Sequence, residues 1–96
     1  MAPRRIAFSK AAEADLDRLA AFIASGSPAR AARAIARLRE GIKPLADFPE
    51  LGVKAAEQAR HLFIRSGKSG YVVRYQILDD VILITRIWHG KEGRLR

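Results

Sequence analysis

Hydrophobic and polar positions follow two different repeats along this chain. Residues 4–8 alternate between the two kinds and therefore predict a short first strand. Within residues 9–45, apolar side chains return every three or four positions, as they do on one face of an amphipathic helix. Every alanine lies at or before Ala59, whereas β-branched residues, which favour strands, are concentrated after Arg60. The sequence therefore predicts a helical part followed by a strand-rich part.

Two helices are predicted within residues 9–45. Ser9 is a suitable N-cap for the first, since its hydroxyl accepts from a free backbone N–H, and three acidic residues follow near the positive end of the helix dipole. Ser25-Gly26 ends this helix and Ser27-Pro28 begins the second, because proline at the first helical position loses no hydrogen bond. With about two residues between them, the helices should form an antiparallel hairpin, and Pro44 should kink or close the last turn of the second helix. The predicted buried positions are Leu16, Leu19, Ala20, Ile23, Ala31, Ile35, Leu38, Ile42 and Leu45, and the acidic residues are Glu13, Asp15 and Asp17.

The second part of the chain predicts three strands. Residues 48–52 form a predicted loop, and residues 53–59, whose pattern is weak, are expected to form a loop or a helical turn. The predicted strands are residues 60–65, 71–78 and 81–88, separated by a turn at 66–70 and by Asp79-Asp80, which suits a tight hairpin. The chain is therefore predicted to be an α+β domain. Its order is β-α-α-β-β-β: an N-terminal strand, an antiparallel helical hairpin and a three-stranded antiparallel sheet.

A two-residue turn at Asp79-Asp80 fixes the expected register of the last two strands, in which directly opposite side chains share a face. The expected pairs are Ile77 with Ile82, Tyr75 with Ile84, Val73 with Arg86, and Tyr71 with Trp88. The other face carries Val72, Arg74, Gln76, Leu83 and Ile87. Since neither face is wholly polar, two interpretations follow. Either the helices cover one face and leave an apolar surface for a partner, or the central strand is buried on both sides.

Composition narrows the class of protein. The 96 residues are 49% hydrophobic and 29% charged, which predicts one globular domain over residues 1–96. Lys and Arg number 18 against 10 for Asp and Glu, and the net charge of +8 suits an anionic partner or serves solubility alone. The chain has neither a membrane-spanning apolar run nor a signal-peptide core, and it lacks cysteine. We therefore expect a cytoplasmic protein without disulfides, membrane contact or cofactor.

Many of the residues most suited to chemistry lie at the end of the last predicted strand and after it. Residues 86–96 contain one histidine, four cationic side chains and Trp88, a set that suits stacking, cation–π contact and phosphate pairing. Such a terminal segment is also often frayed. Metal-free RNA cleavage needs a base, a proton donor and cations for the phosphorane, whereas a histidine near a strand end is often structural. The side chains available for cleavage are Arg60, Arg86, His89, Lys91 and Arg94.

An ordered set of short motifs resembles the RelE/ParE superfamily of toxins from bacterial type II toxin–antitoxin systems. The matching residues are Phe8-Ser9, Ala12, Asp15-Leu16, Leu19, Phe48-Pro49, Gly52, Arg60, Leu62, Gly70-Tyr71-Val72-Val73, Tyr75, Ile82, Ile84, Arg86-Ile87 and His89-Gly90. The resemblance spans almost the whole chain and implies a helical hairpin on a small antiparallel sheet. It also implies an acidic antitoxin, folded along the sheet and the hairpin, in a toxin–antitoxin heterotetramer.

The resemblance favours the ParE-like branch, whose toxins poison DNA gyrase and need no catalytic residues of their own. Arg60 with Leu62 and the ending from Arg86 to Lys91 are similar to that branch. The target-binding residues that this implies are Arg60, Arg86, Trp88, His89, Gly90, Lys91 and Arg94.

The alternative is a RelE-like endonuclease that cuts mRNA on the ribosome. That branch carries basic residues on its strands and a late Tyr or His. In this chain His61 and Phe63 occupy alternating positions where the branch has basic residues, and Val72 stands where an Arg is expected. The late Tyr has no counterpart. If the protein is a nuclease, the expected catalytic residues are Arg60, Arg86, His89 and Lys91.

Overall fold

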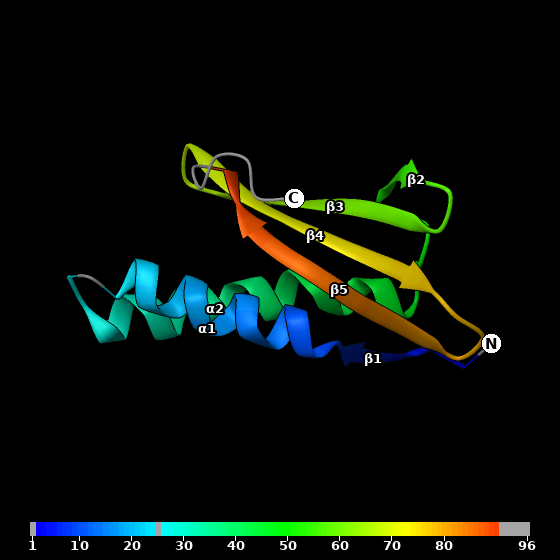
Figure 1. Ribbon diagram of the computed structural model, residues 1–96, viewed down its shortest axis with the longest axis horizontal. Helices are drawn as coiled ribbons and strands as arrows, with labels where there is room; N and C mark the ends of the chain where they lie inside the picture. Colours follow the sequence, from blue (N-terminus) through cyan, green and yellow to red (C-terminus); the bar gives the residue numbers. More distant parts are fainter. Residues whose placement is uncertain (1, 25, 91–96) are drawn as a thin grey trace.

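One five-stranded sheet and a helical hairpin form the fold in a computed structural model that describes residues 2–24 and 26–90. The elements are β1 (Arg5–Phe8), α1 (Lys10–Ile23), α2 (Pro28–Ile42), the 3-10 helix η1 (Lys43–Ala46), β2 (Val53–Ala56), β3 (Ala59–Ser66), β4 (Ser69–Ile77) and β5 (Val81–His89). Both helices lie on one side of the sheet (Figure 1). The predicted α+β class and order of elements are confirmed, with five strands in the sheet instead of three. Within the described ranges, no helix has the length and apolar character needed to cross a membrane.

The helices begin where local sequence signals place them. The Ser9 hydroxyl accepts from the Ala12 N–H at 3.0 Å, and the Ser27 hydroxyl accepts from the Arg30 N–H at 3.2 Å. Each cap satisfies a backbone donor that the first helical turn leaves free. At the other end of α2, Pro44 lies in the single 3-10 turn of η1. Ser25, which the sequence places at the end of the first helix, lies outside the described residues.

The expectation of a loop or helical turn at residues 53–59 is wrong, because Val53–Ala56 forms strand β2. This strand lies at the edge of the sheet and pairs antiparallel with β3, Val53 opposite His61. All of its residues are exposed. A strand that buries neither face needs no alternation of apolar and polar residues, so its sequence carries no strand signal. At the opposite edge β1 runs parallel to β5.

A β-bulge in β5 corrects the expected register. The pairs Ile77 with Ile82 and Tyr75 with Ile84 are confirmed. Beyond them Thr85 is an extra residue, so the expected pairs of Val73 with Arg86 and Tyr71 with Trp88 are wrong. The observed pairs are Arg74 with Arg86, Val73 with Ile87, Val72 with Trp88 and Tyr71 with His89. A bulge shifts the alternation by one residue, and here it moves Ile87 to the helix side of the sheet and Arg86 and Trp88 to the other side.

The bulge coincides with the docking point of α1. The Ser9 N–H donates to the Ile84 carbonyl at 2.9 Å, and the Ser9 hydroxyl donates to the Thr85 carbonyl at 3.1 Å. On the other side the Thr85 hydroxyl donates to the Arg74 carbonyl at 3.1 Å. The backbone carbonyls of Ile84 and Thr85 and the Thr85 hydroxyl therefore all have partners at the bulge. The bonds from Ser9 fix the beginning of α1 against β5.

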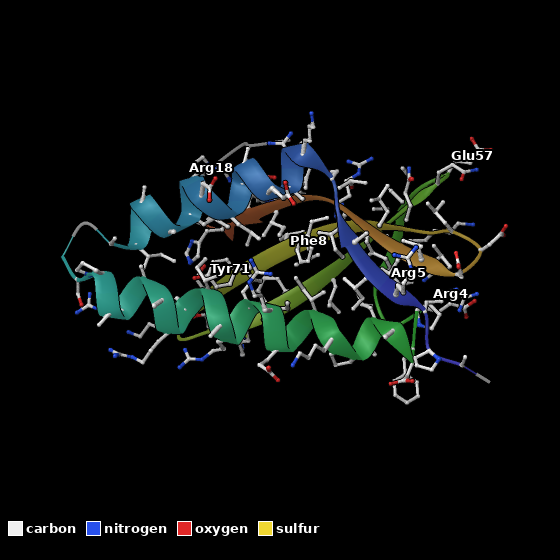
Figure 2. All side chains as sticks on the ribbon, turned by 90° about the horizontal axis from the view of Figure 1, so that it is seen from below. Arg4, Arg5, Phe8, Arg18, Glu57 and Tyr71 are labelled. Carbon is white, nitrogen blue, oxygen red and sulfur yellow. The ribbon has the colours of Figure 1, made fainter. Side chains whose placement is uncertain are left out.

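The hydrophobic core lies between the hairpin and the sheet. The residues with the most completely buried side chains are Leu19, Leu38, Ile42, Leu45, Val73, Tyr75, Ile82, Ile84 and Ile87. Figure 2 shows Phe8 and Tyr71 in this layer, whereas Glu57 lies away from the helices on the β2–β3 turn. A Cβ on Gly41 would lie 2.9 Å from the Ile64 side chain, so α2 approaches β3 closely at that glycine. No element among the described residues covers the opposite face, which favours the first of the two interpretations of the sheet.

Candidate functional site

Asp15 on α1 closes the open edge of β5. Strand β1 ends with Phe8 opposite Ile84, so the next residues of β5 have no strand on that side. Instead, the Asp15 carboxylate accepts from the Ile87 N–H at 2.8 Å, and Arg18 donates to the Ile87 carbonyl at 3.1 Å. Two side chains of the helix therefore satisfy the backbone groups that a neighbouring strand would otherwise pair.

The same carboxylate binds two arginines. Arg86 donates to Asp15 through Nε at 2.8 Å and through Nη2 at 3.2 Å, and Arg18 donates to the carboxylate from the next turn of α1. Asp15 is only 2% exposed. Burial alone would raise the pKa of Asp15, but the hydrogen bonds from Arg86, the Ile87 N–H and Arg18 outweigh it and hold the pKa below 3.8. Asp15, which the sequence predicted to interact with the helix dipole, thus links α1 to β5.

This link predicts a loss of stability in acid. Because the pKa of Asp15 is lower in the folded protein, its contribution is complete above the unfolded value and disappears as the pH falls through the folded value. Urea unfolding of the wild-type protein and of Asp15→Asn should show a large difference in the free energy of unfolding at neutral pH. The difference should shrink between about pH 5 and about pH 2. A difference independent of pH would contradict the role given to the ionised carboxylate.

Arg60 and Tyr75 fix the loop at residues 48–52 against the sheet. The Arg60 guanidinium donates to the Gly52 carbonyl at 2.7 Å. The Tyr75 hydroxyl donates to the Pro49 carbonyl at 2.7 Å and accepts from the Gly52 N–H at 2.9 Å. Burial raises the pKa of Tyr75, so the hydroxyl keeps its proton at neutral pH. Arg60, a predicted site residue, therefore has a structural contact in the loop motif that carried part of the family resemblance.

The remaining predicted residues lie around the end of β5. The His89 ring contacts the rings of Tyr71 and Phe22, with centroids 5.0 and 6.1 Å apart, on the helix side of the sheet. Trp88 lies on the opposite side, where its ring and the ring of His61 pack edge to face with their centroids 5.4 Å apart. A Cβ on Gly90 would lie 3.0 Å from the Ser69 hydroxyl. Lys91 and Arg94 lie outside the described residues.

The described members of the predicted nuclease set lie at different places on the sheet. Arg60 pairs across the strands with Tyr75, whereas His89 pairs with Tyr71, four residues away along β4, which is about 13 Å. Arg86 lies on the other side of the sheet and binds Asp15. The structure brings Arg86 and Trp88 onto one face, and it keeps Arg60 and His89 apart from each other and from that face.

The sheet surface away from the helices is named here the outer face. Its residues are His61 and Phe63 on β3, Val72, Arg74 and Gln76 on β4, and Leu83, Arg86 and Trp88 on β5. A cavity of about 570 Å³ lies over Arg74, Gln76 and Arg86, walled by residues 56–59. Burial and the nearby Arg74 cation lower the pKa of His61, so its ring is neutral at pH 7. The outer face is therefore a mixed apolar and cationic surface.

A second surface is the groove between α1 and α2, with a volume of about 650 Å³. Its lining residues are almost all small and apolar: Ala20, Ala21, Ala24, Pro28, Ala31, Ala32, Ile35, Ala36 and Arg39. Two exposed arginines of α2, Arg33 and Arg37, belong to the same helix. The groove thus offers an apolar trough on a strongly cationic helix.

Sequence reasoning missed the importance of Asp15, Arg18 and Arg74. One signal for Asp15 was present, because it stands three residues after Ala12 and four before Leu19, within the apolar stripe of α1. An acidic residue in a buried stripe must be paired. Arg74 carried no comparable signal, because its position opposite Arg86 depends on the bulge.

Comparisons with known proteins agree with the fold and the motifs. The chain matches the family described as "ParE toxin of type II toxin-antitoxin system, parDE" over residues 6–93. It is 35% identical to "Toxin RelE1" of Caulobacter vibrioides over 86% of this chain and 89% of that one, and 32% identical to "Toxin RelE3" of the same organism over 86% and 90%.

A solved structure has the same fold. It is described as "Chromosomal ParDE TA system from P. aeruginosa" and superposes with a TM-score of 0.74, covering 90% of this chain and 95% of that chain at 21% identity. The family match and the curated relatives both extend over most of the sequence. The chain therefore belongs to the ParE toxin family, within the RelE/ParE superfamily of type II toxin–antitoxin systems.

Proposed function

We propose that this toxin acts by binding DNA gyrase and that a cognate acidic antitoxin neutralises it. The observation that carries the first part is the separation of the three predicted nuclease residues that the structure describes: Arg60 is bound to the loop carbonyl of Gly52, Arg86 to Asp15, and His89 lies against aromatic rings. A nuclease needs its base, acid and cations around one phosphodiester group. Because these groups lie apart, the arrangement supports a toxin that acts by binding its target and not by cleaving RNA.

The antitoxin is supported by family and by chemistry. The similar structure from P. aeruginosa is described as a ParDE toxin–antitoxin system. This chain carries a net charge of +8 and offers an apolar groove between its helices and a mixed apolar and cationic outer face. Burial of apolar side chains would supply most of the affinity, and the opposite charges would speed and orient the association.

Two assays on the purified protein separate the proposed target from its alternative. We expect inhibition of gyrase supercoiling and accumulation of gyrase-linked cleaved DNA, with translated mRNA intact in primer extension. His89→Ala serves as the matched variant, because a mRNA-cleaving protein would lose its cuts with this change. If the wild-type protein cuts mRNA on the ribosome, the cuts vanish in His89→Ala and gyrase is unaffected, the gyrase proposal is wrong and the protein is an mRNA endonuclease.

The antitoxin part has its own test. Expression of the chain alone should arrest growth, and co-expression with the product of the adjacent reading frame should restore it. The two proteins should also purify together. An absence of both growth arrest and binding would contradict the proposed role of this chain as a toxin with a cognate antitoxin.

A further inference from the structure

The loop between η1 and β2, residues 47–52, exposes large apolar side chains. Six such side chains are exposed among the described residues, and three of them stand within six positions: Phe48 at 64%, Leu51 at 53% and Val53 at 71%. Phe48 and Leu51 line one cavity of about 400 Å³ together with Pro49. Exposed apolar side chains that gather in one segment are typical of a surface that binds another protein.

Hydrogen bonds hold the backbone of this loop in one conformation. The Phe48 carbonyl accepts from the Leu51 N–H at 3.1 Å, which closes a β-turn with Pro49 at its second position. The Tyr75 hydroxyl and the Arg60 guanidinium bind further carbonyls of the loop and fix it to the sheet. Phe48 and Leu51 therefore stand at the two ends of a fixed turn. A surface that is already ordered loses less conformational entropy when it binds a partner.

The charge of the loop is opposite to that of the whole chain. Asp47 and Glu50 are exposed and line the same cavity as Phe48 and Leu51. Residues 47–52 contain no lysine or arginine, whereas the chain carries a net charge of +8. Carboxylates repel phosphates, so a nucleic acid does not fit this surface. They also repel an acidic antitoxin. The partner of the loop is therefore a protein surface with apolar and cationic side chains.

We propose that residues 47–52 form the part of the toxin that docks on gyrase. In the complex Phe48 and Leu51 contact apolar side chains of gyrase, and the two carboxylates contact cationic ones. The inference rests on the proposed function, because it names the surface through which the toxin reaches gyrase. An enzyme that holds DNA carries cationic side chains where the phosphates bind, and such side chains also attract carboxylates. The cationic surfaces of the toxin stay available to an acidic antitoxin.

Leu51→Ser tests the apolar part of the contact, and Leu78→Ser is its matched control. Leu51→Ser should raise the toxin concentration that half-inhibits gyrase supercoiling by about tenfold, because serine supplies little apolar contact area. Phe48→Ser should have an effect at least as large. Leu78 is also exposed, at 44%, but lies between β4 and β5, so its substitution should leave inhibition unchanged. Because all three side chains are exposed, each variant should keep its Tm within about 3 °C of wild type.

Glu50→Lys tests the charge of the loop with two measurements that should move in opposite directions. The new cation should raise the half-inhibitory concentration for gyrase by about tenfold, because it meets cationic side chains there. It should also speed association with the acidic antitoxin encoded by the adjacent reading frame. A general loss of structure would weaken both interactions. Asp17→Lys, at an exposed position of α1, is the control with the same change of net charge and should leave gyrase inhibition unchanged.

The outcomes separate this inference from the function on which it rests. If the wild-type toxin inhibits gyrase and Phe48→Ser and Leu51→Ser inhibit it equally well, the docking loop is wrong and the gyrase proposal stands. If the wild-type toxin does not inhibit gyrase, both are wrong. If the two variants inhibit gyrase normally but no longer bind the antitoxin in calorimetric titration, the loop is an antitoxin surface and the inference is overturned.

Discussion

Asp15→Ala is expected to lower the free energy of unfolding by about 3 kcal/mol, because it removes one partner from a buried ion pair and leaves the other charged. The carboxylate is the acceptor for Arg86, Arg18 and the Ile87 N–H at the edge of β5. Its removal leaves that N–H buried without an acceptor. The side chain of Arg86 is 32% exposed and keeps partial contact with water. The expected loss of unfolding free energy is therefore at the lower end of the range for a broken buried ion pair.

Urea denaturation followed by circular dichroism measures this effect. Asp15→Asn should retain part of the stability, about 1 kcal/mol above Asp15→Ala, since an amide oxygen can still accept from the Ile87 N–H without neutralising Arg86. Asp17→Ala, two residues along α1 and exposed, should change the free energy of unfolding by less than about 0.5 kcal/mol. Equal effects of the Asp15 and Asp17 substitutions would contradict the assigned link between α1 and β5.

Gly52→Ala should lower the free energy of unfolding by a similar amount, about 3 kcal/mol, because the site has no room for a methyl group. A Cβ there would lie 2.7 Å from the His61 carbonyl oxygen and 2.8 Å from the Tyr75 hydroxyl. The carbonyl belongs to the backbone of β3 and cannot rotate away. The loop must therefore move, and its movement would also stretch the bonds of Tyr75 to the loop at Pro49 and Gly52.

Thermal unfolding of two glycine variants gives the comparison. Gly26→Ala is the matched control, because a Cβ at Gly26 meets nothing within 4 Å. We expect the Tm of Gly52→Ala to fall by more than about 10 °C and that of Gly26→Ala to stay within about 3 °C of wild type. A Gly52→Ala protein with wild-type Tm would show that the loop tolerates displacement and that its contacts with the sheet contribute little.

The helical hairpin was predictable because its signals are local. Ser9, Ser27 and Pro28 mark helix starts through interactions within one turn, and the apolar stripes repeat with the helical period. The strands from residue 60 onwards were predictable for a similar reason. Strand β2 was not, since an edge strand that buries neither face is held by backbone pairing alone.

The face on which each site residue lies was beyond local reasoning. The turn fixes the register of the β4–β5 hairpin only as long as each residue of one strand pairs with one residue of the other. Thr85 is an extra residue in β5, and the register changes there. Its bulge is fixed by Ser9, 76 residues earlier in the chain. One extra residue therefore exchanged the positions of Arg86 and Ile87, and it brought Arg74 and Arg86 together. The sequence predicted which residues gather at the last strand, but it could not predict which of them share a surface.

The parallel pairing of β1 with β5 has a consequence for folding during translation. β1 pairs with β5, the strand farthest from it along the described sequence, with Arg5 opposite Val81 and Phe8 opposite Ile84. Contacts between such distant segments form slowly, because the intervening chain must first be brought together. A nascent chain still missing β5 has neither this pairing nor the acceptors that fix the start of α1. The native fold can therefore form only after β5 has been synthesised.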